Sequence, residues 1–323
     1  MSQVPVQIEL TGAPLLEAVY EFLGRFVAYP SDACHVAHVR WVAHAHLMDV
    51  WDSTPRLAFL SPEPGSGKTR ALEVTELLVP RPVETVNVTP AYLFRKVAAE
   101  EGRPTILFDE IDTVFGPKAK GNEETRGLIN AGHRRGAFAG RCVVRGKIVE
   151  TEEIPAYCAV ALAGLGNLPD TILTRSVVVR MRRRAPGEQV EPFRRREVLP
   201  RGDALRGALV RWARRIEGSL SGAWPSLPGE IKDRDADVWE PLLAVADAAG
   251  GRWPQIARVS AVTLVTASRG DTPSLGIRLL ADLKSIWGDT SHRSTSELLD
   301  VLNGMIEAPW GDLRGIKLCK ANT

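Results

Sequence analysis

Apolar residues recur at helical spacing near the start of the chain. Between Pro14 and Val27 they fall three and four positions apart, which predicts an amphipathic helix. The sequence Pro30-Ser31-Asp32 interrupts this pattern and supplies a cap for a second helix, which we expect to run to about Trp51. Residues 1–52 are therefore predicted to form an N-terminal helical segment.

From residue 53 the pattern alternates between short apolar runs and longer helical stretches. Strand-like runs occur at residues 56–60, 83–88, 105–110, 156–164 and 176–181, and helical patterns at residues 68–79, 91–101 and 123–135. Strands separated by helices of this length predict a parallel sheet covered by helices on both faces. Residues 141–150 alternate as a β-hairpin would. We expect this α/β core to span residues 53–185.

The stretch APGEQVEP, residues 185–192, is rich in proline and glycine and ends this unit. From Pro200 to about Trp287 the patterns are helical, and WEPLLAVADAAG is the clearest case. We therefore predict a helical lid domain over residues 186–290. Residues 291–323 are expected to form a C-terminal tail, whose last segment, GDLRGIKLCKANT, carries no readable pattern.

Composition excludes several classes of protein. The 323 residues are 44% hydrophobic and 25% charged, as is ordinary for a soluble globular protein. There is no uninterrupted apolar stretch of about 18 residues, and the N-terminus lacks the basic start and apolar core of a signal peptide. The four cysteines lie far apart with no CxxC pair. We therefore expect a cytoplasmic protein without a membrane partner.

Charge is unevenly distributed although the formal net charge is only +2. Between Arg175 and Arg215 there are thirteen arginines against four acidic residues. Such a run indicates either a solvated basic surface around a linker or a groove for nucleic-acid phosphates.

The stretch SPEPGSGKTRALE, from Ser61 to Glu73, has the composition of a phosphate-binding loop. Glycines let backbone N–H groups close around an anion at a helix N-terminus, and a lysine reaches the terminal phosphates. The usual first glycine of GxxxxGK[ST] is Pro62 here, at a position that shapes the entry to the loop. A glycine-rich turn is the alternative. We expect the loop to bind ATP through Pro64, Gly65, Ser66, Gly67, Lys68, Thr69 and Arg70, with Thr69 holding Mg²⁺.

A second motif, TILFDEID, ends an apolar run in two adjacent carboxylates. Asp109 would lie in the Mg²⁺ shell, and Glu110 would polarise a water molecule, which is the Walker B division of labour. Paired acids are common on surfaces, but here they follow a phosphate loop at a suitable distance. The pair therefore predicts hydrolysis of ATP in addition to binding.

With these motifs the chain resembles the AAA+ branch of P-loop ATPases from about Leu57 to Met181. The resemblance implies that Asn167 in AVALAGLGN is the sensor 1 residue, and that Asn87 in VNVT restrains the catalytic glutamate. It also implies that Arg175 in PDTILTRSVVV reaches the nucleotide of a neighbouring subunit in a ring-shaped homo-oligomer, expected to be a hexamer. A turn cap and a surface arginine are the structural alternatives for Asn167 and Arg175.

Three stretches resemble a more specific family. PRLAFLSPEPGSGKTRALE, LPDTILTRSVVVRMRRR and WEPLLAVADAAGGRWP are similar to phage and actinobacterial helicase-like ATPases known as domain-of-unknown-function family 3631. We expect this match to run from the N-terminal helices to about Trp310. The resemblance implies no established activity.

Four of the six histidines, His35, His38, His44 and His46, fall within HVAHVRWVAHAH. A metal site needs histidines on one helical face together with further ligands. His35 and His38 can share a face, but His44 and His46 point apart and no cysteine or acid completes a set. We therefore expect a helix packed beside the nucleotide pocket, and assign no metal other than Mg²⁺.

The favoured function is a phage- or prophage-related DNA-directed motor, similar to a helicase or translocase. The hairpin RCVVRGKIVE lies between the helix after Walker B and the strand that leads to Asn167. In superfamily III helicases and their relatives, a hairpin inserted here points into the central channel and touches DNA. The resemblance implies that Arg145 and Lys147, at the predicted turn Arg145-Gly146-Lys147, contact DNA.

Two other functions remain open. A protein-remodelling ATPase usually carries an aromatic–hydrophobic–glycine pore loop, whereas the nearest candidate, Tyr92-Leu93-Phe94, lies in a helical pattern without a glycine. A nucleotide-gated oligomeric switch, acting in phage defence or phage control, is excluded by nothing in the sequence.

Overall fold

The computed structural model describes residues 10–85, 89–99, 102–115, 123–145, 148–270, 275–287, 292–305 and 310. The chain divides into two compact units, Met1–Ser268 and Arg269–Thr323. The first unit contains the sheet, the helices that precede α10 (Trp253–Gly270), and all but the last two residues of α10. The finer division into four segments, at residues 52, 185 and 290, stays a prediction.

Five parallel strands form the central sheet of the first unit, in the order β2-β3-β6-β1-β7. They are β1 (Arg56–Ser61), β2 (Pro82–Thr85), β3 (Thr105–Phe108), β6 (Ala159–Leu165) and β7 (Ser176–Arg180). Alternate residues of β1 enter different cores: Leu57 packs in one, and Ala58 in the other. Because both faces are buried, these strands have apolar runs instead of a polar–apolar alternation. The predicted parallel sheet flanked by helices is confirmed.

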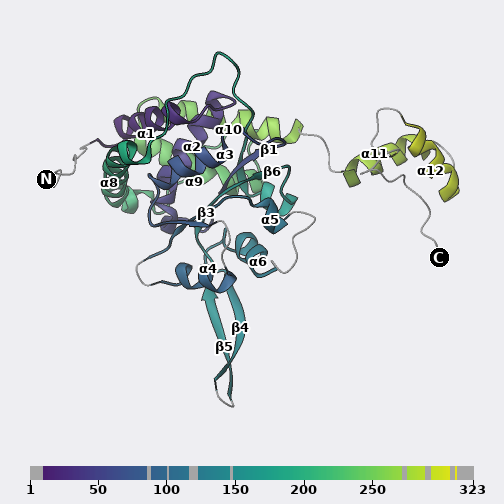
Figure 1. The fold of residues 1–323 in the computed structure, drawn as a ribbon, viewed down its shortest axis with the longest axis horizontal. Helices are drawn as coiled ribbons and strands as arrows, with labels where there is room; N and C mark the ends of the chain where they lie inside the picture. The colour runs from purple at the N-terminus through teal and green to yellow at the C-terminus, as the bar shows by residue number, and fades with distance from the viewer. Residues whose placement is uncertain are drawn as a thin grey trace. The chain divides into compact units, whose positions relative to one another are not determined.

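Helices from both ends of the unit cover one face of the sheet. They are α1 (Ala13–Phe26), α2 (Asp32–Ala45), α3 (Lys68–Glu76), α8 (Arg195–Leu220), α9 (Arg234–Ala249) and α10, and their buried residues share one core. The second core is built by the shorter helices α4 (Pro90–Val97), α5 (Asp112–Phe115), α6 (Glu123–Ala131) and α7 (Asp170–Leu173). Figure 1 shows α4 and α6 on the side of the sheet away from α1 and α2.

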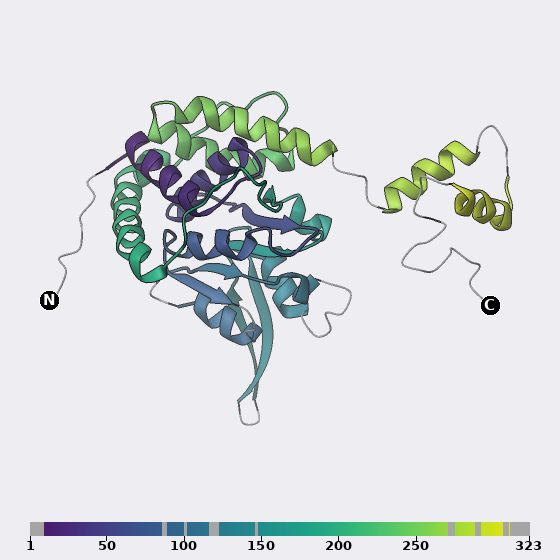
Figure 2. The ribbon, with the colours of Figure 1, turned by 45° about the horizontal axis from the view of Figure 1, so that its top comes forward.

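The antiparallel strands β4 (Phe138–Arg145) and β5 (Ile148–Pro155) form a hairpin between α6 and β6. It projects away from the rest of the first unit in both views (Figures 1 and 2). The predicted hairpin is confirmed, and its strands are longer than expected. The prediction of a three-residue turn was wrong, because Arg145 pairs with Ile148 and so belongs to β4. Gly146 and Lys147 lie outside the described residues.

The second unit contains α11 (Leu275–Trp287) and α12 (Thr295–Gly304). Ser294 and Glu297 form a capping box at the start of α12. The sequence carries this signal of a helix start, but the prediction of a tail did not use it. Trp310 is buried, and its indole Nε1 donates a hydrogen bond to Asp282 Oδ2 at 2.7 Å.

Helix α2 is buried on every side and attaches its histidines to neighbouring segments. The imidazole nitrogens of His35, His44 and His46 lie within hydrogen-bonding distance of Tyr20 O, Thr54 Oγ1 and Leu78 O. These contacts join α2 and its C-terminal cap, His46, to α1, to the segment before β1 and to the segment after α3. The histidines therefore serve as polar packing groups within the core.

His38 connects α2 to α3 through a hydrogen bond to Thr75, and the bond that Thr75 makes in turn fixes which atom is the donor. The Thr75 hydroxyl donates to Ala71 O at 2.6 Å, so it accepts from His38 Nε2 at 2.8 Å. His38 Nδ1 then accepts from the Tyr29 hydroxyl at 2.7 Å. His38 is therefore the neutral Nε2–H tautomer, and it packs α2 against the helix that follows the predicted phosphate loop.

We predict that acid destabilises the fold through these histidines. Burial lowers the pKa of His38 and His44 to about 3, and of His35 and His46 to about 4. An imidazole in the unfolded chain has a pKa of about 6.5, so the unfolded state binds more protons below that pH. The free energy of unfolding should fall by roughly 2 kcal/mol per imidazole between pH 7 and pH 5.

Urea unfolding at several pH values measures this loss. His38→Gln removes one of these imidazoles, so the change in unfolding free energy between pH 7 and pH 5 should shrink by about one quarter of the four-histidine total. An unfolding free energy that stays flat between pH 7 and pH 5 contradicts the prediction.

Candidate functional site

The predicted phosphate loop connects the end of β1 to the start of α3. Gly65 has a φ of 73° and Gly67 a φ of 84°, in the left-handed region that glycine adopts at little cost. Gly67 also caps the N-terminus of α3, which begins at Lys68. The strand–loop–helix context of the motif is therefore present, and it directs the backbone N–H groups of a helix start toward the loop.

Lys68 lies folded over this loop. Its ammonium group donates to Glu63 O at 3.2 Å and to Ser66 Oγ at 3.1 Å. Burial lowers the pKa of Lys68, and the carboxylates of Asp109, Asp112 and Glu63 partly oppose this shift. The lysine thus places a cation at the centre of the loop, where it would meet a bound anion.

Thr69 and Asp109 come together at the carboxyl edge of the sheet. The Thr69 hydroxyl donates to Asp109 Oδ2 at 2.8 Å, and the backbone N–H of Glu110 donates to Asp109 Oδ1 at 2.9 Å. Hydroxyl and carboxylate oxygens are the ligands that Mg²⁺ prefers. The two side chains therefore fit a shared Mg²⁺ ion.

Glu110 adopts an unusual backbone conformation directly beside this pair. Its φ is 54°, which is uncommon for a residue other than glycine, and its side chain is exposed. Such strain often accompanies a functional geometry. The conformation turns the chain sharply after β3, so that Ile111 N can donate to Ala163 O of β6 at 2.9 Å.

Asn167 lies two residues beyond the end of β6, at the same edge of the sheet. Its side-chain oxygen accepts from Arg180 Nη1 at 2.6 Å, and Gly166 N donates to Ser61 O at 2.9 Å. Arg180 ends β7, so this contact passes over the end of β1 that leads into the loop. Sequence reasoning missed Arg180, because only the strand order brings it to Asn167.

Arg183 is a second residue that sequence reasoning missed at the loop. Its Nε lies 3.2 Å from Pro64 O and 3.2 Å from Glu63 Oε2. In the sequence it is one arginine among many, so no local signal distinguishes it.

Arg175 lies at the opposite edge of the sheet. It directly precedes β7, and its carbonyl accepts from Arg56 N at the start of β1, at 2.9 Å. The structure therefore does not bring Arg175 to the loop of its own chain. Asn87 and Lys147 lie outside the described residues, and Arg145 is placed by its backbone alone.

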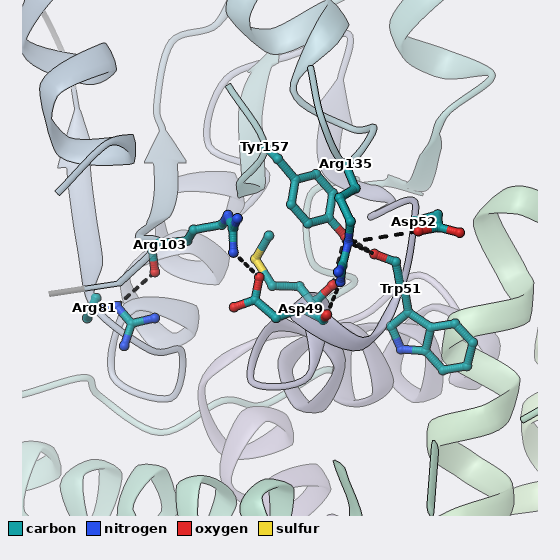
Figure 3. A network of polar contacts seen from close by, with 8 residues as sticks. Asp49, Trp51, Asp52, Arg81, Arg103, Arg135 and Tyr157 are labelled. Carbon is teal, nitrogen blue, oxygen red and sulfur yellow. Dashed lines mark hydrogen bonds and ion pairs between the residues drawn. The ribbon is translucent and has the colours of Figure 1, made fainter. Parts of the chain in front are cut away.

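The two ends of the hairpin are attached to the same short segment, residues 48–52 (Figure 3). Arg135, before β4, donates from Nε to Trp51 O at 3.0 Å and from its terminal nitrogen to Asp49 O. The hydroxyl of Tyr157, after β5, lies 2.7 Å from Met48 O and 2.9 Å from Trp51 O. The base of the hairpin is therefore tied to the connection that precedes β1.

Arginines reinforce this attachment. Arg103 forms an ion pair with Asp49, and the guanidinium groups of Arg103 and Arg135 lie over the Tyr157 ring, 5.5 Å and 6.0 Å from its centroid. Burial is the main cause that raises the pKa of Tyr157, so its hydroxyl stays protonated at neutral pH. Arg81 extends the network by donating to Arg103 O at 2.8 Å.

The basic run from Arg175 to Arg215 does not form one continuous unpaired surface. Ion pairs join Arg182 to Glu188, Arg183 to Glu63, Arg194 to Glu197, Arg195 to Glu76 and Arg206 to Asp203. This pairing lowers the net charge that the run presents, and it favours the solvated surface over a dedicated groove. In the described part of the chain, no helix is both long enough and apolar enough to cross a membrane.

Residues 180–322 match the profile of a family described as "Protein of unknown function (DUF3631)". The match begins at the end of β7, so the predicted phosphate loop, Asp109 and Asn167 precede it. It starts later than the expected match from the N-terminal helices, and it reaches beyond Trp310.

A stretch of 131 residues is 48% identical to the "Uncharacterized 28.9 kDa protein in xis 5'region" of Saccharopolyspora erythraea. It covers 40% of this chain and 49% of that protein, so the chain spans about half the length of the curated relative it matches. The name of this relative states no activity.

Proposed function

We propose that this chain is a Mg²⁺-dependent ATP hydrolase of the AAA+ type. The observation that carries the proposal is the 2.8 Å hydrogen bond between Thr69 and Asp109, beside the loop that holds Lys68. A chance glycine turn has no reason to bring together a hydroxyl of α3 and a carboxylate that follows β3, because β1 and β3 are not neighbours in the sheet. An ion site at a phosphate loop requires that arrangement.

Each residue then has a defined task. Backbone N–H groups of residues 65–70 and the Lys68 ammonium would hold the phosphates of ATP, while Thr69 and Asp109 would hold Mg²⁺. Pro64 has no N–H and would only shape the loop. Bound Mg²⁺ neutralises charge on the phosphates. Glu110 would accept a proton from the attacking water, with Asn87 restraining its carboxylate. Asn167, positioned by Arg180, would contact the phosphate end of the site.

The placement of Arg175 supports action between subunits. The residue lies at the amino edge of the sheet, whereas its own phosphate loop lies at the carboxyl edge. A strand of six residues separates these edges by about 20 Å, which is too far for a side chain to span. We therefore propose a ring-shaped homo-oligomer, with six subunits as the expected number, in which Arg175 reaches a neighbour's nucleotide.

We further propose that ATP hydrolysis drives movement on DNA. The hairpin projects from the first unit, and its strands carry Arg145 at the end of β4 and Lys147 in the connection. Two basic residues per subunit, repeated around a ring, can follow a phosphate backbone without reading bases. The name of the relative, which refers to an xis 5' region, agrees with a phage- or prophage-related role.

The candidate pore loop of a remodelling ATPase receives little support. Leu93 and Phe94 lie within α4 and are buried in the second core, so of these three residues only Tyr92 has an exposed side chain.

Our first functional prediction separates binding from turnover. Lys68→Ala removes the charge that meets the phosphates, so its affinity for ATP should fall by about tenfold or more. Glu110→Gln removes only the proton acceptor, so affinity should persist while turnover falls by about a hundredfold or more. Nucleotide titration and phosphate release measure the two effects. A Glu110→Gln protein with normal turnover contradicts the assigned role.

The second functional prediction concerns Arg175. Arg175→Ala should bind ATP normally but hydrolyse it roughly a thousandfold more slowly, because it removes charge stabilisation from a neighbour's site. Mixing this variant with Lys68→Ala protein should restore some turnover, since each variant supplies what the other lacks. A monomer by light scattering, fully active with ATP present, rules out this arrangement.

The third functional prediction concerns DNA. Arg145→Ala/Lys147→Ala should abolish stimulation of hydrolysis by DNA while sparing the basal rate, and should reduce the salt dependence of DNA binding. The control Arg214→Ala/Arg215→Ala removes two exposed charges from α8 and should retain stimulation. An unchanged response in the hairpin variant, or no response to DNA in the wild type, favours the nucleotide-gated switch instead.

A further inference from the structure

A pocket of about 370 Å³ opens at the amino edge of the sheet. Its walls come from four places: residues 52–55 before β1, residues 133–134 before the hairpin, residues 174–175 before β7, and the first turns of α9. The phosphate loop lies at the other end of β1. The pocket is therefore separate from the site of Lys68 and Asp109 in the same chain.

Three arginines line this pocket: Arg134, Arg175 and Arg234. Arg175 donates to Thr171 O at 3.2 Å, while in the described part of the chain Arg134 and Arg234 have no side-chain hydrogen bond or ion pair. Asp52 and Asp237 also line the pocket, but the ion pair of Asp52 is a 3.9 Å contact with Arg135. Three arginines and two aspartates leave the lining with a formal excess of one positive charge.

Such an arrangement is suited to a phosphate group. Each guanidinium carries five N–H donors in a planar fork that matches phosphate oxygens, and like charges that share a pocket repel until an anion joins them. The pKa of His133, in the same wall, is lowered to about 4, first by burial and further by Arg56, Arg175 and Arg134. This shift agrees with a positive potential inside the pocket.

We propose that this pocket binds the terminal phosphate groups of a nucleotide held by a second copy of the chain, and that Arg134 and Arg234 act there together with Arg175. That the phosphates belong to a nucleotide of a second copy rests on the proposed function. A second copy is required because the chain's own loop lies at the opposite edge of the sheet. The three arginines come from three separate elements, so a bound phosphate would join α9 to the segments that precede the hairpin and β7.

The pocket also shares a wall with the attachment of the hairpin. Arg134 forms a β-bridge with Ser53, and Thr54 N donates to His133 O at 2.8 Å. The next residue, Arg135, holds the carbonyls of residues 49 and 51. A phosphate bound by Arg134 would therefore act one residue away from the base of the hairpin.

The test uses the full chain with Arg134→Gln/Arg234→Gln, in which Arg175 is retained. ATP affinity should stay within twofold of the wild type, and hydrolysis should be at least tenfold slower. Mixing with Lys68→Ala protein should restore activity, because Lys68→Ala copies offer an intact pocket to neighbours with an intact loop. The control Arg214→Gln/Arg215→Gln removes the same charge from α8 and should hydrolyse ATP normally.

Normal turnover in Arg134→Gln/Arg234→Gln, or slow turnover that mixing does not restore, overturns the inference. If the wild type itself does not hydrolyse ATP, the proposed function fails. Binding of tripolyphosphate then tests separately whether the pocket is a phosphate site. Calorimetry measures tripolyphosphate binding to Lys68→Ala protein, whose own loop is disabled. The affinity should be at least tenfold weaker in a chain that carries Arg134→Gln/Arg234→Gln as well. Equal binding with and without these two changes rejects the pocket as a phosphate site.

Discussion

The hydrogen bond from the Thr69 hydroxyl to the Asp109 carboxylate joins two segments whose strands, β1 and β3, are not neighbours. Strand β6 lies between them, so the turn after β3 must pass close to β6. Gly164 permits this approach, because a Cβ atom there would lie 2.6 Å from Ile111 Cγ2 and 3.1 Å from Asp112 Oδ1. The geometry of the candidate ion site therefore depends on the absence of one side chain in the intervening strand.

The same sheet separates two sets of functional candidates by the length of a strand. The carboxyl edge carries the predicted phosphate loop, Asp109 and Asn167, whereas the amino edge carries Arg175, the arginine pocket and the base of the hairpin. Residues 48–55 contact the hairpin base, line the pocket and continue directly into β1, which ends at the loop. Under the proposed function, this continuous segment connects the pocket for a neighbour's nucleotide to the base of the hairpin.

Much of the fold was predictable because its signals are local. Buried parallel strands have apolar runs, a phosphate loop needs glycines at fixed spacing, and the Asp109–Glu110 pair directly follows its strand. Contacts between distant segments were not predictable in this way. Arg134 and Arg234 share a pocket although they are far apart in the sequence, and Arg180 reaches Asn167 because of the strand order. The ion pair of Arg195 with Glu76 likewise could not be predicted from the basic run, because Glu76 lies far from it in the sequence.

The buried histidines connect the stability of the fold to the candidate site. His38 lies between the Tyr29 hydroxyl and the Thr75 hydroxyl, and Thr75 belongs to the helix that begins at Lys68. A protonated His38 would have two donors, so Nδ1 could no longer accept the Tyr29 proton, and its charge would be buried without a carboxylate partner. Protonation would therefore break the contact of His38 Nδ1 with Tyr29, which precedes α2, while Nε2 keeps its donation to Thr75. Acid would therefore disturb the packing of α2 against the segment that precedes it, at an imidazole that also contacts the helix beginning at Lys68.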